Sequence, residues 1–236
     1  MRFVALLLHR PLSLIVAVLV AAGTASGGPI ISTPSGLNAG DQFRIVFVTS
    51  GTTTAESRDI TTYDNFVNDQ ASGATYNGNT ITWQAIGSTS GVNAIDHIGV
   101  TNAPVYLADG TLVAGTDGSW FSDSSPVVLS HAINEDITTA KMSVVVWTGT
   151  RTSGTPPYQG ALGQTSSVAG YSYLTDGQWV DSISTDPTQY FHLYGISDVL
   201  TVQSAAVPEP STAMLAGLGS LAAVAISAYP RRRVAV

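Results

Sequence analysis

The chain has 236 residues, with 16 acidic and 9 basic side chains, a formal net charge of −7 and no cysteine. The missing cysteine excludes disulfides, thiol nucleophiles and cysteine-ligated metal sites, so the stability of the fold must come from burial. The length suits one sizeable domain between terminal targeting segments.

The N-terminus has the pattern of a secretory signal peptide. A basic start precedes an apolar run over residues 12–22, and small residues follow at 23–27. A signal peptidase recognises this order of segments. We therefore predict a signal peptide over residues 1–27, cleaved after Ala25 or Gly27, with a retained N-terminal anchor as the alternative.

Residues 28–206 remain as one predicted extracytoplasmic domain, and this domain is strongly acidic. It contains four basic side chains against fifteen acids, a formal charge of −11. Such a charge repels nucleic acids and anionic membrane surfaces. We expect no nucleic-acid partner, and instead neutral glycans, cations or a cation-bridged matrix.

The first half of this domain predicts two strands and a helix. Residues 43–48 are rich in aromatic and β-branched side chains, which favours a strand. From Asp59, the predicted N-cap, apolar side chains recur every three or four residues as far as Ala71, which indicates an amphipathic helix. A turn at Asn77-Gly78 then leads into a strand over residues 81–86.

The second half of the domain predicts strands separated by long polar segments. The predicted strands cover residues 105–107, 143–148, 191–196 and 199–202. A turn at Asp109-Gly110 follows the first of them. We therefore predict an α+β fold, a single loop-rich domain on a small framework rather than a regular sandwich.

A succession of short segments gives this domain a resemblance to a known fold. They are Phe43-Arg44, Ala85–Ser88, Pro104–Gly110, Val146–Thr150 and Gly170–Trp179. Together they resemble the C-type lectin-like fold, and are most similar to the endostatin-type domain of collagens, in which a Pro-Val strand, a Trp-x-Gly segment and a late tryptophan occur in this order. The resemblance spans about residues 41–202 and implies a lectin-like domain, although the chain lacks the disulfides common in that fold.

Aromatic side chains supply the candidate binding surface. Flat rings on loops suit the apolar faces of sugars. Three tyrosines form the candidate ligand platform, with a core position as the open alternative for each: Tyr158, Tyr171 and Tyr173. Trp120 and Phe121 share their loop-like context, whereas Trp147 and Trp179 are predicted to be core.

The acidic loops raise the question of a metal ion, because calcium prefers several oxygen ligands. The acids concerned are Asp117, Asp123, Glu135, Asp136, Asp176 and Asp181. None forms an EF-hand loop, and the sugar-binding motifs of calcium-dependent lectins are absent. We expect solvated acidic loops and no cofactor, with structural calcium as the alternative.

The sequence contains no recognisable catalytic motif. His97, His131 and His192 are far apart and form no metal-binding pair, and no Gly-x-Ser-x-Gly elbow exists. We predict a non-enzymatic protein. A secreted hydrolase acting on matrix glycans is the alternative, and it would require clustered carboxylates or a serine and a carboxylate beside His131 or His192.

The C-terminus combines three parts in order. A motif of Val207, Pro208, Glu209 and Pro210 precedes an apolar run, and Arg231, Arg232 and Arg233 lie close to the end. The 19 residues 211–229 would span about 28 Å as a helix, near the ~30 Å core of a bilayer. The arginines would stay on the cytoplasmic side. We predict one transmembrane helix followed by a basic end.

This arrangement over residues 207–236 resembles the PEP-CTERM sorting signal of Gram-negative bacteria, which an exosortase recognises and cuts; an ordinary single-pass anchor is the alternative. The resemblance implies an exported protein, processed by signal peptidase and exosortase. It would be held in the inner membrane by its C-terminal helix before processing, and then lie at the cell surface or in the extracellular matrix. We predict a role in adhesion or association with extracellular polysaccharide, with packing into a surface layer as a further alternative.

Overall fold

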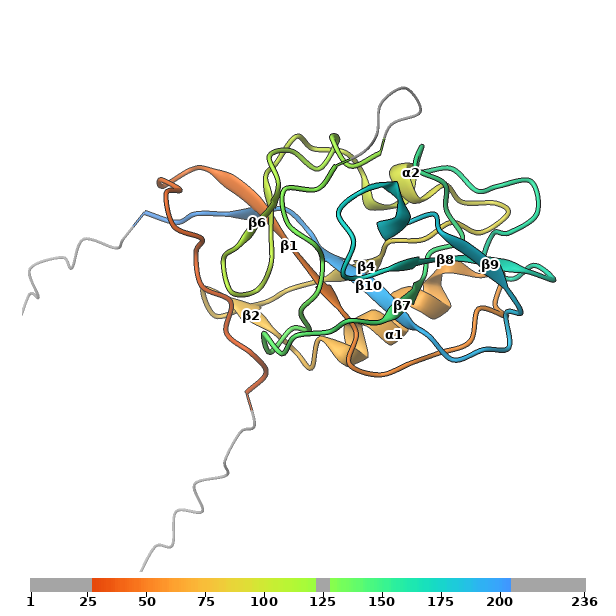
Figure 1. Cartoon of the computed structure of the whole chain (residues 1–236). Helices are drawn as coiled ribbons and strands as arrows, with labels where there is room; N and C mark the ends of the chain where they lie inside the picture. Colours follow the sequence, from red (N-terminus) through yellow and green to blue (C-terminus); the bar gives the residue numbers. More distant parts are fainter. Residues whose placement is uncertain (1–26, 122–127, 205–236) are drawn as a thin grey trace, which may run out of the picture.

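The computed structural model describes residues 27–121 and 128–204, which form a mixed fold that is mostly sheet with few helices (Figure 1). Its elements in chain order are β1 (Gln42–Val48), α1 (Ile60–Gln70), β2 (Thr75–Tyr76), β3 (Asn79–Thr80), β4 (Trp83–Ala85), α2 (Ala94–Ile98), β5 (Val105–Tyr106), β6 (Leu112–Ala114), β7 (Val145–Trp147), β8 (Ser167–Tyr171), the 3₁₀ helix η1 (Gly177–Trp179), β9 (Ile183–Thr185), β10 (His192–Ser197) and β11 (Leu200–Thr201).

One large sheet organises the domain around its first and last long strands. Its order is β6-β5-β1-β10-β7-β8-β9, with β11 also paired to β1 and β4 also paired to β10. The strands β1 and β10 are antiparallel, with Val46 opposite Ile196 and Val48 opposite Tyr194. Parallel pairs flank them, β5 beside β1 and β7 beside β10. The first and last long strands of the domain therefore pair at the centre of the sheet.

Strand β1 is buried on both faces. Its side chains alternate between two hydrophobic cores, because successive residues of a strand point to opposite sides. Phe43, Ile45 and Phe47 belong to one core, and Val46 and Val48 to the other. This double burial explains the nearly continuous apolar run in the sequence of β1.

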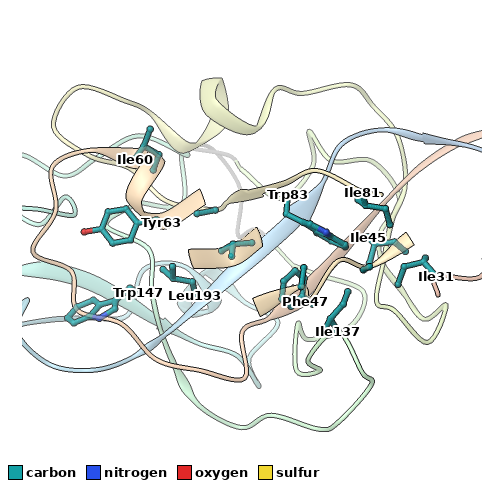
Figure 2. Close-up of a cluster of buried hydrophobic side chains, with 14 of the residues drawn as sticks. Ile31, Ile45, Phe47, Ile60, Tyr63, Ile81, Trp83, Ile137, Trp147 and Leu193 are labelled. Carbon is teal, nitrogen blue, oxygen red and sulfur yellow. The ribbon is translucent and has the colours of Figure 1, made fainter. Parts of the chain in front are cut away.

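Helix α1 covers the first of these cores, here called the helix-side core. It packs on β4 and β10 and buries Ile60, Tyr63 and Val67. Figure 2 shows Tyr63 and Ile60 of α1 in the same cluster as Trp83, Phe47 and Leu193. Gly195 of β10 permits this close approach, because a Cβ there would lie 2.5 Å from side-chain atoms of both Phe47 and Val67.

Irregular chain covers the second core, here called the loop-side core. Trp120 and Trp179 come from outside the strands and stack with their ring centroids 5.7 Å apart. Helix α2 adds Ala94 and Ile98; it lies on the opposite side of β10 from α1 (Figure 1). Gly170 of β8 is needed here, since a Cβ would lie 1.9 Å from the backbone oxygen of Trp179.

The strongest sequence predictions are confirmed. They are β1, α1 with Asp59 as its N-cap, β10 and the turn at Asn77-Gly78, where both residues have positive φ. The predicted strands at 81–86, 105–107, 143–148 and 199–202 are present but shorter. The sequence does not predict β2, β3, α2, β6, β8, η1 or β9, which are short or poor in alternating apolar residues. The predicted signal peptide and C-terminal helix lie outside the described residues.

Candidate functional site

Two of the three predicted platform tyrosines lie together at one end of the β7–β8 hairpin. Tyr171 is the last residue of β8 and Tyr173 follows it by two positions. Their ring centroids are 5.4 Å apart at an interplanar angle of 37°. Tyr173 is 47% exposed and Tyr171 is half-buried. The pair offers two adjacent ring surfaces to solvent, of the kind that can stack on sugars.

Tyr158 belongs to a different part of the same hairpin. It is 89% exposed and lies in the connection between β7 and β8. That connection leaves the hairpin where Trp147 pairs with Ala169, whereas Tyr171 pairs with Val145 at the other end. No ring contact joins Tyr158 to Tyr171 or Tyr173 in the described part of the chain. The predicted platform therefore divides into a tyrosine pair and a single exposed tyrosine.

Trp120 and Phe121 lie outside the helices and strands, as expected, but they are buried and offer no surface to a ligand. Trp120 is fully buried and Phe121 is 6% exposed. Both rings pack near Trp179, within 6.2 Å of a neighbouring ring centroid. Burial of large rings stabilises the loop-side core, which has no long helix to cover it. The predictions that Trp147 and Trp179 are core are confirmed.

Asp117, one of the acids considered as a calcium ligand, forms a buried ion pair with Arg44. Arg44 Nη1 lies 3.3 Å from Asp117 Oδ2, and the two side chains are 1% and 0% exposed. Asp117 also accepts hydrogen bonds from the backbone N–H of Thr101 and Asn102 and from the Thr101 hydroxyl. Burial lowers the pKa of Arg44, and the hydrogen bond and charge of Asp117 oppose that shift.

Arg44 connects the segment that carries Asp117 to the centre of the sheet. Its Nε donates to the carbonyl of Ser197 at 2.8 Å, and its Nη1 donates to the carbonyls of Ile98 and Gly99 at 3.0 and 2.9 Å. The pair satisfies charges that would otherwise be costly in the interior. The pair therefore holds the segment around residues 98–117 against β1.

Other acids considered for the calcium alternative close turns. Asp136 Oδ1 accepts from the backbone N–H of Thr138 and Ala140, and Asp176 accepts from the N–H of Gln178 at the start of η1. Burial raises the pKa of Asp181, opposed by the charge of Arg151. Asp123 lies outside the described residues. Over residues 27–121 and 128–204, no three histidine or acidic side chains are grouped as metal ligands.

Glu135 is different, because it forms a cluster with Asp109 and Lys141. Glu135 is 1% exposed, and its Oε1 accepts a hydrogen bond from Lys141 Nζ. Its carboxyl group also interacts with that of Asp109. Burial raises the pKa of Glu135, and the charge and hydrogen bond of Asp109 add to the rise, while Lys141 opposes it. Partial burial favours a higher pKa for Asp109 as well, but hydrogen bonds from Thr111 and Glu135 and the charge of Lys141 leave it lowered.

Asp109, the outer member of this cluster, also borders a hollow of about 260 Å³. Asp109, Ala108 and Gly110 form one wall and residues 32–35 form the other. Asp109 was recognised from the sequence only as a turn residue. Its proximity to Glu135 joins residues 26 positions apart, so no local spacing could have indicated the cluster.

The histidines do not form the arrangement named for the hydrolase alternative. His131 Nδ1 lies 2.8 Å from the carbonyl of Ala132, and His192 Nδ1 lies 2.7 Å from the carbonyl of Thr49. Within the described residues, the histidine paired with a carboxylate is His97, whose Nε2 lies 2.9 Å from Asp64 Oδ1. Asp64 also accepts from the backbone N–H of Ala85, so this pair connects α1, β4 and α2.

Comparison with known families identifies the C-terminal segment. Residues 206–233 match the PEP-CTERM protein-sorting motif. The match includes Val207–Pro210 and Arg231–Arg233, which lie outside the described residues. No curated protein matches the chain. In residues 27–121 and 128–204 there is no helix with the length and apolarity to cross a membrane.

The sorting motif supports an exported protein that an exosortase processes, with a destination at the cell surface or outside the cell. It carries no information about the activity of residues 28–206.

Proposed function

We propose that this protein is a surface or extracellular-matrix protein whose lectin-like domain associates with extracellular polysaccharide. The observation that carries the proposal is the exposed pair Tyr171 and Tyr173 on a protein with an exosortase sorting motif. Sugar rings have apolar C–H faces, and adjacent tyrosine rings bind such faces while their hydroxyls remain hydrated.

The topology is compatible with the lectin-like part of the proposal. The first and last long strands pair antiparallel at the centre of the sheet, and long irregular segments lie between them. Loops held on a rigid scaffold are frequent locations of binding residues. The acidic surface also favours a neutral or cation-bridged polymer over a polyanion without cations.

The hydrolase alternative has less support from the geometry. A glycosidase needs two carboxyl groups about 5 Å apart or more, so that a substrate or water fits between them. Glu135, the carboxylate that interacts with Asp109, is 1% exposed and paired with Lys141, so it is not presented to a substrate. His131 and His192 are each bound to a backbone carbonyl. We therefore place polysaccharide association first.

A polysaccharide-binding screen tests the proposal directly. The full chain would be applied to an array of glycans and matrix polysaccharides, with and without calcium. We expect binding that falls about thirtyfold in the Tyr171→Ala/Tyr173→Ala double variant, because each stacked ring contributes about 1 kcal/mol. Tyr158→Ala would show whether the separate tyrosine takes part.

Tyr190→Ala is the matched control, since Tyr190 is 69% exposed and lies just before β10. Binding that is equally strong in the double variant and the control would overturn the tyrosine platform. A blank array would overturn the polysaccharide role and favour packing into a surface layer, which self-association of the purified chain would then reveal.

A further inference from the structure

Glu135 has a buried carboxylate oxygen without a protein hydrogen-bond donor. Its Oε1 is paired with Lys141, whereas its Oε2 has no donor. Among the described residues it is the only carboxylate with a buried oxygen in this state. Buried polar atoms are nearly always satisfied, and a bound ion or water is a common explanation where the protein supplies no partner.

The backbone holds Glu135 in this position. The N–H of Val48, at the end of β1, donates to the Glu135 carbonyl at 2.7 Å. Asp136 closes the following turn, so that Lys141 returns opposite Glu135 in an antiparallel bridge. The backbone of Glu135 is therefore held by two contacts that do not involve its carboxylate.

Asp109 places a second carboxyl group against the first. It lies in the turn between β5 and β6, where its Oδ1 accepts from the backbone N–H of Thr111 at 2.8 Å. Two carboxylates this close repel each other unless a proton or a cation lies between them. Lys141 neutralises only one charge, and its side chain is 63% exposed.

The site is open to solvent on the Asp109 side. The adjoining hollow is about 260 Å³ in volume and is bordered by Ser32, Thr33 and Ser35 as well as Asp109. Carboxylates, hydroxyls and water are the oxygen donors that calcium and magnesium prefer. Calcium accepts irregular geometry and several waters more readily than magnesium does when the donors come from loops.

We propose that Asp109 and Glu135 bind a divalent cation, with calcium as the best fit, at the edge of this hollow. The cation takes the unpartnered Glu135 Oε2 and the Asp109 carboxylate as protein ligands, and water with hydroxyls of residues 32–35 completes its shell. Lys141 competes with the cation for Glu135. The inference is independent of the polysaccharide role.

Calcium titration of the full chain at pH 7.5, followed by calorimetry and thermal unfolding, tests the site. We expect saturable binding and a higher Tm with calcium. Asp109→Asn and Glu135→Gln each weaken the affinity about tenfold or more, since charge count sets calcium affinity. Lys141→Met raises the calcium affinity about fivefold, because an exposed ammonium group no longer competes with the cation for Glu135.

The Lys141 variant separates ligand binding from a structural role, since loss of an ion pair by itself would give no increase in affinity. Glu56→Gln is the matched control, because Glu56 is exposed and remote from the cluster in sequence; it should leave the affinity unchanged. Absence of calcium binding in both the wild type and Lys141→Met would overturn the proposal and leave a shared proton as the explanation of the pair. Equal weakening by Glu56→Gln would show a diffuse charge effect and would also overturn it.

Discussion

The helix-side and loop-side cores lie on the two faces of the same sheet, but different kinds of structure cover them. On the helix side, α1 buries three side chains spaced by three and four residues. On the loop side, irregular segments are held by stacked tryptophans and by a buried ion pair between Arg44 and Asp117. A regular helix satisfies its own backbone, whereas irregular chain needs specific side-chain partners to be buried. The loop side should therefore depend more strongly on single polar residues.

The largest expected effect comes from breaking the buried ion pair. Asp117→Asn leaves the Arg44 charge in the interior without its carboxylate, and we expect a loss of about 3–5 kcal/mol in the free energy of unfolding. Urea unfolding followed by tryptophan fluorescence measures this. Asp186→Asn is the control, because Asp186 is exposed and only closes a turn with Thr188. Similar losses in both variants would contradict the special dependence of the loop side on Asp117.

Two tyrosine hydroxyls provide a matched test of the two faces. Tyr194 donates to the carbonyl of Trp179 at 3.0 Å in the loop-side core, and Tyr63 donates to the carbonyl of Ser57 at 2.8 Å on the helix side. Tyr194→Phe leaves a buried acceptor unsatisfied and should cost about 1–3 kcal/mol, against about 1 kcal/mol for Tyr63→Phe. Denaturant unfolding of both variants gives the comparison. A greater loss of stability in Tyr63→Phe than in Tyr194→Phe would contradict the expected difference between the two faces.

Raising the pH should lower the stability of the fold because these two tyrosine side chains are buried. Burial raises the pKa of Tyr63 from its ordinary value of 10.0 to about 12, and raises that of Tyr194 as well. A raised pKa in the folded state means that the unfolded chain loses its proton first, so stability is complete below pH 10 and falls as the pH rises towards 12. Unfolding measured at several pH values in this window should show a shallower fall in Tyr63→Phe and in Tyr194→Phe. An unchanged slope in both variants would argue against buried hydroxyls.

The smallest effect is expected at the start of α1. Asp59 Oδ1 accepts from the backbone N–H of Thr61 at 3.0 Å and is exposed. Asp59→Ala should lower the Tm only slightly, because one cap is lost while the buried face of the helix remains. Asp59→Asn should restore most of the difference, since asparagine is an equally good cap. A large drop in Tm on Asp59→Ala would mean that the helix side depends on single polar contacts as the loop side does.

The sequence by itself determined the parts whose signals are local. Strand β1, helix α1 with its cap, the Asn77-Gly78 turn and the sorting motif can each be read from residues adjacent in the chain. Their physical basis is backbone propensity, periodicity and an ordered set of peptide features, none of which depends on distant partners.

Only the tertiary structure decided which distant residues meet. Arg44 and Asp117 are 73 positions apart, and Asp109 joins Glu135 only because β1, β5 and the segment after residue 132 converge. Packing against Trp179 buried Trp120, and the pairing of β7 with β8 placed Tyr158 and Tyr171 at different ends of their hairpin. These outcomes depend on how the chain closes around the sheet. Spacing along the sequence carries no information about which distant residues come close, and the burial of a side chain is set by the elements that pack against it.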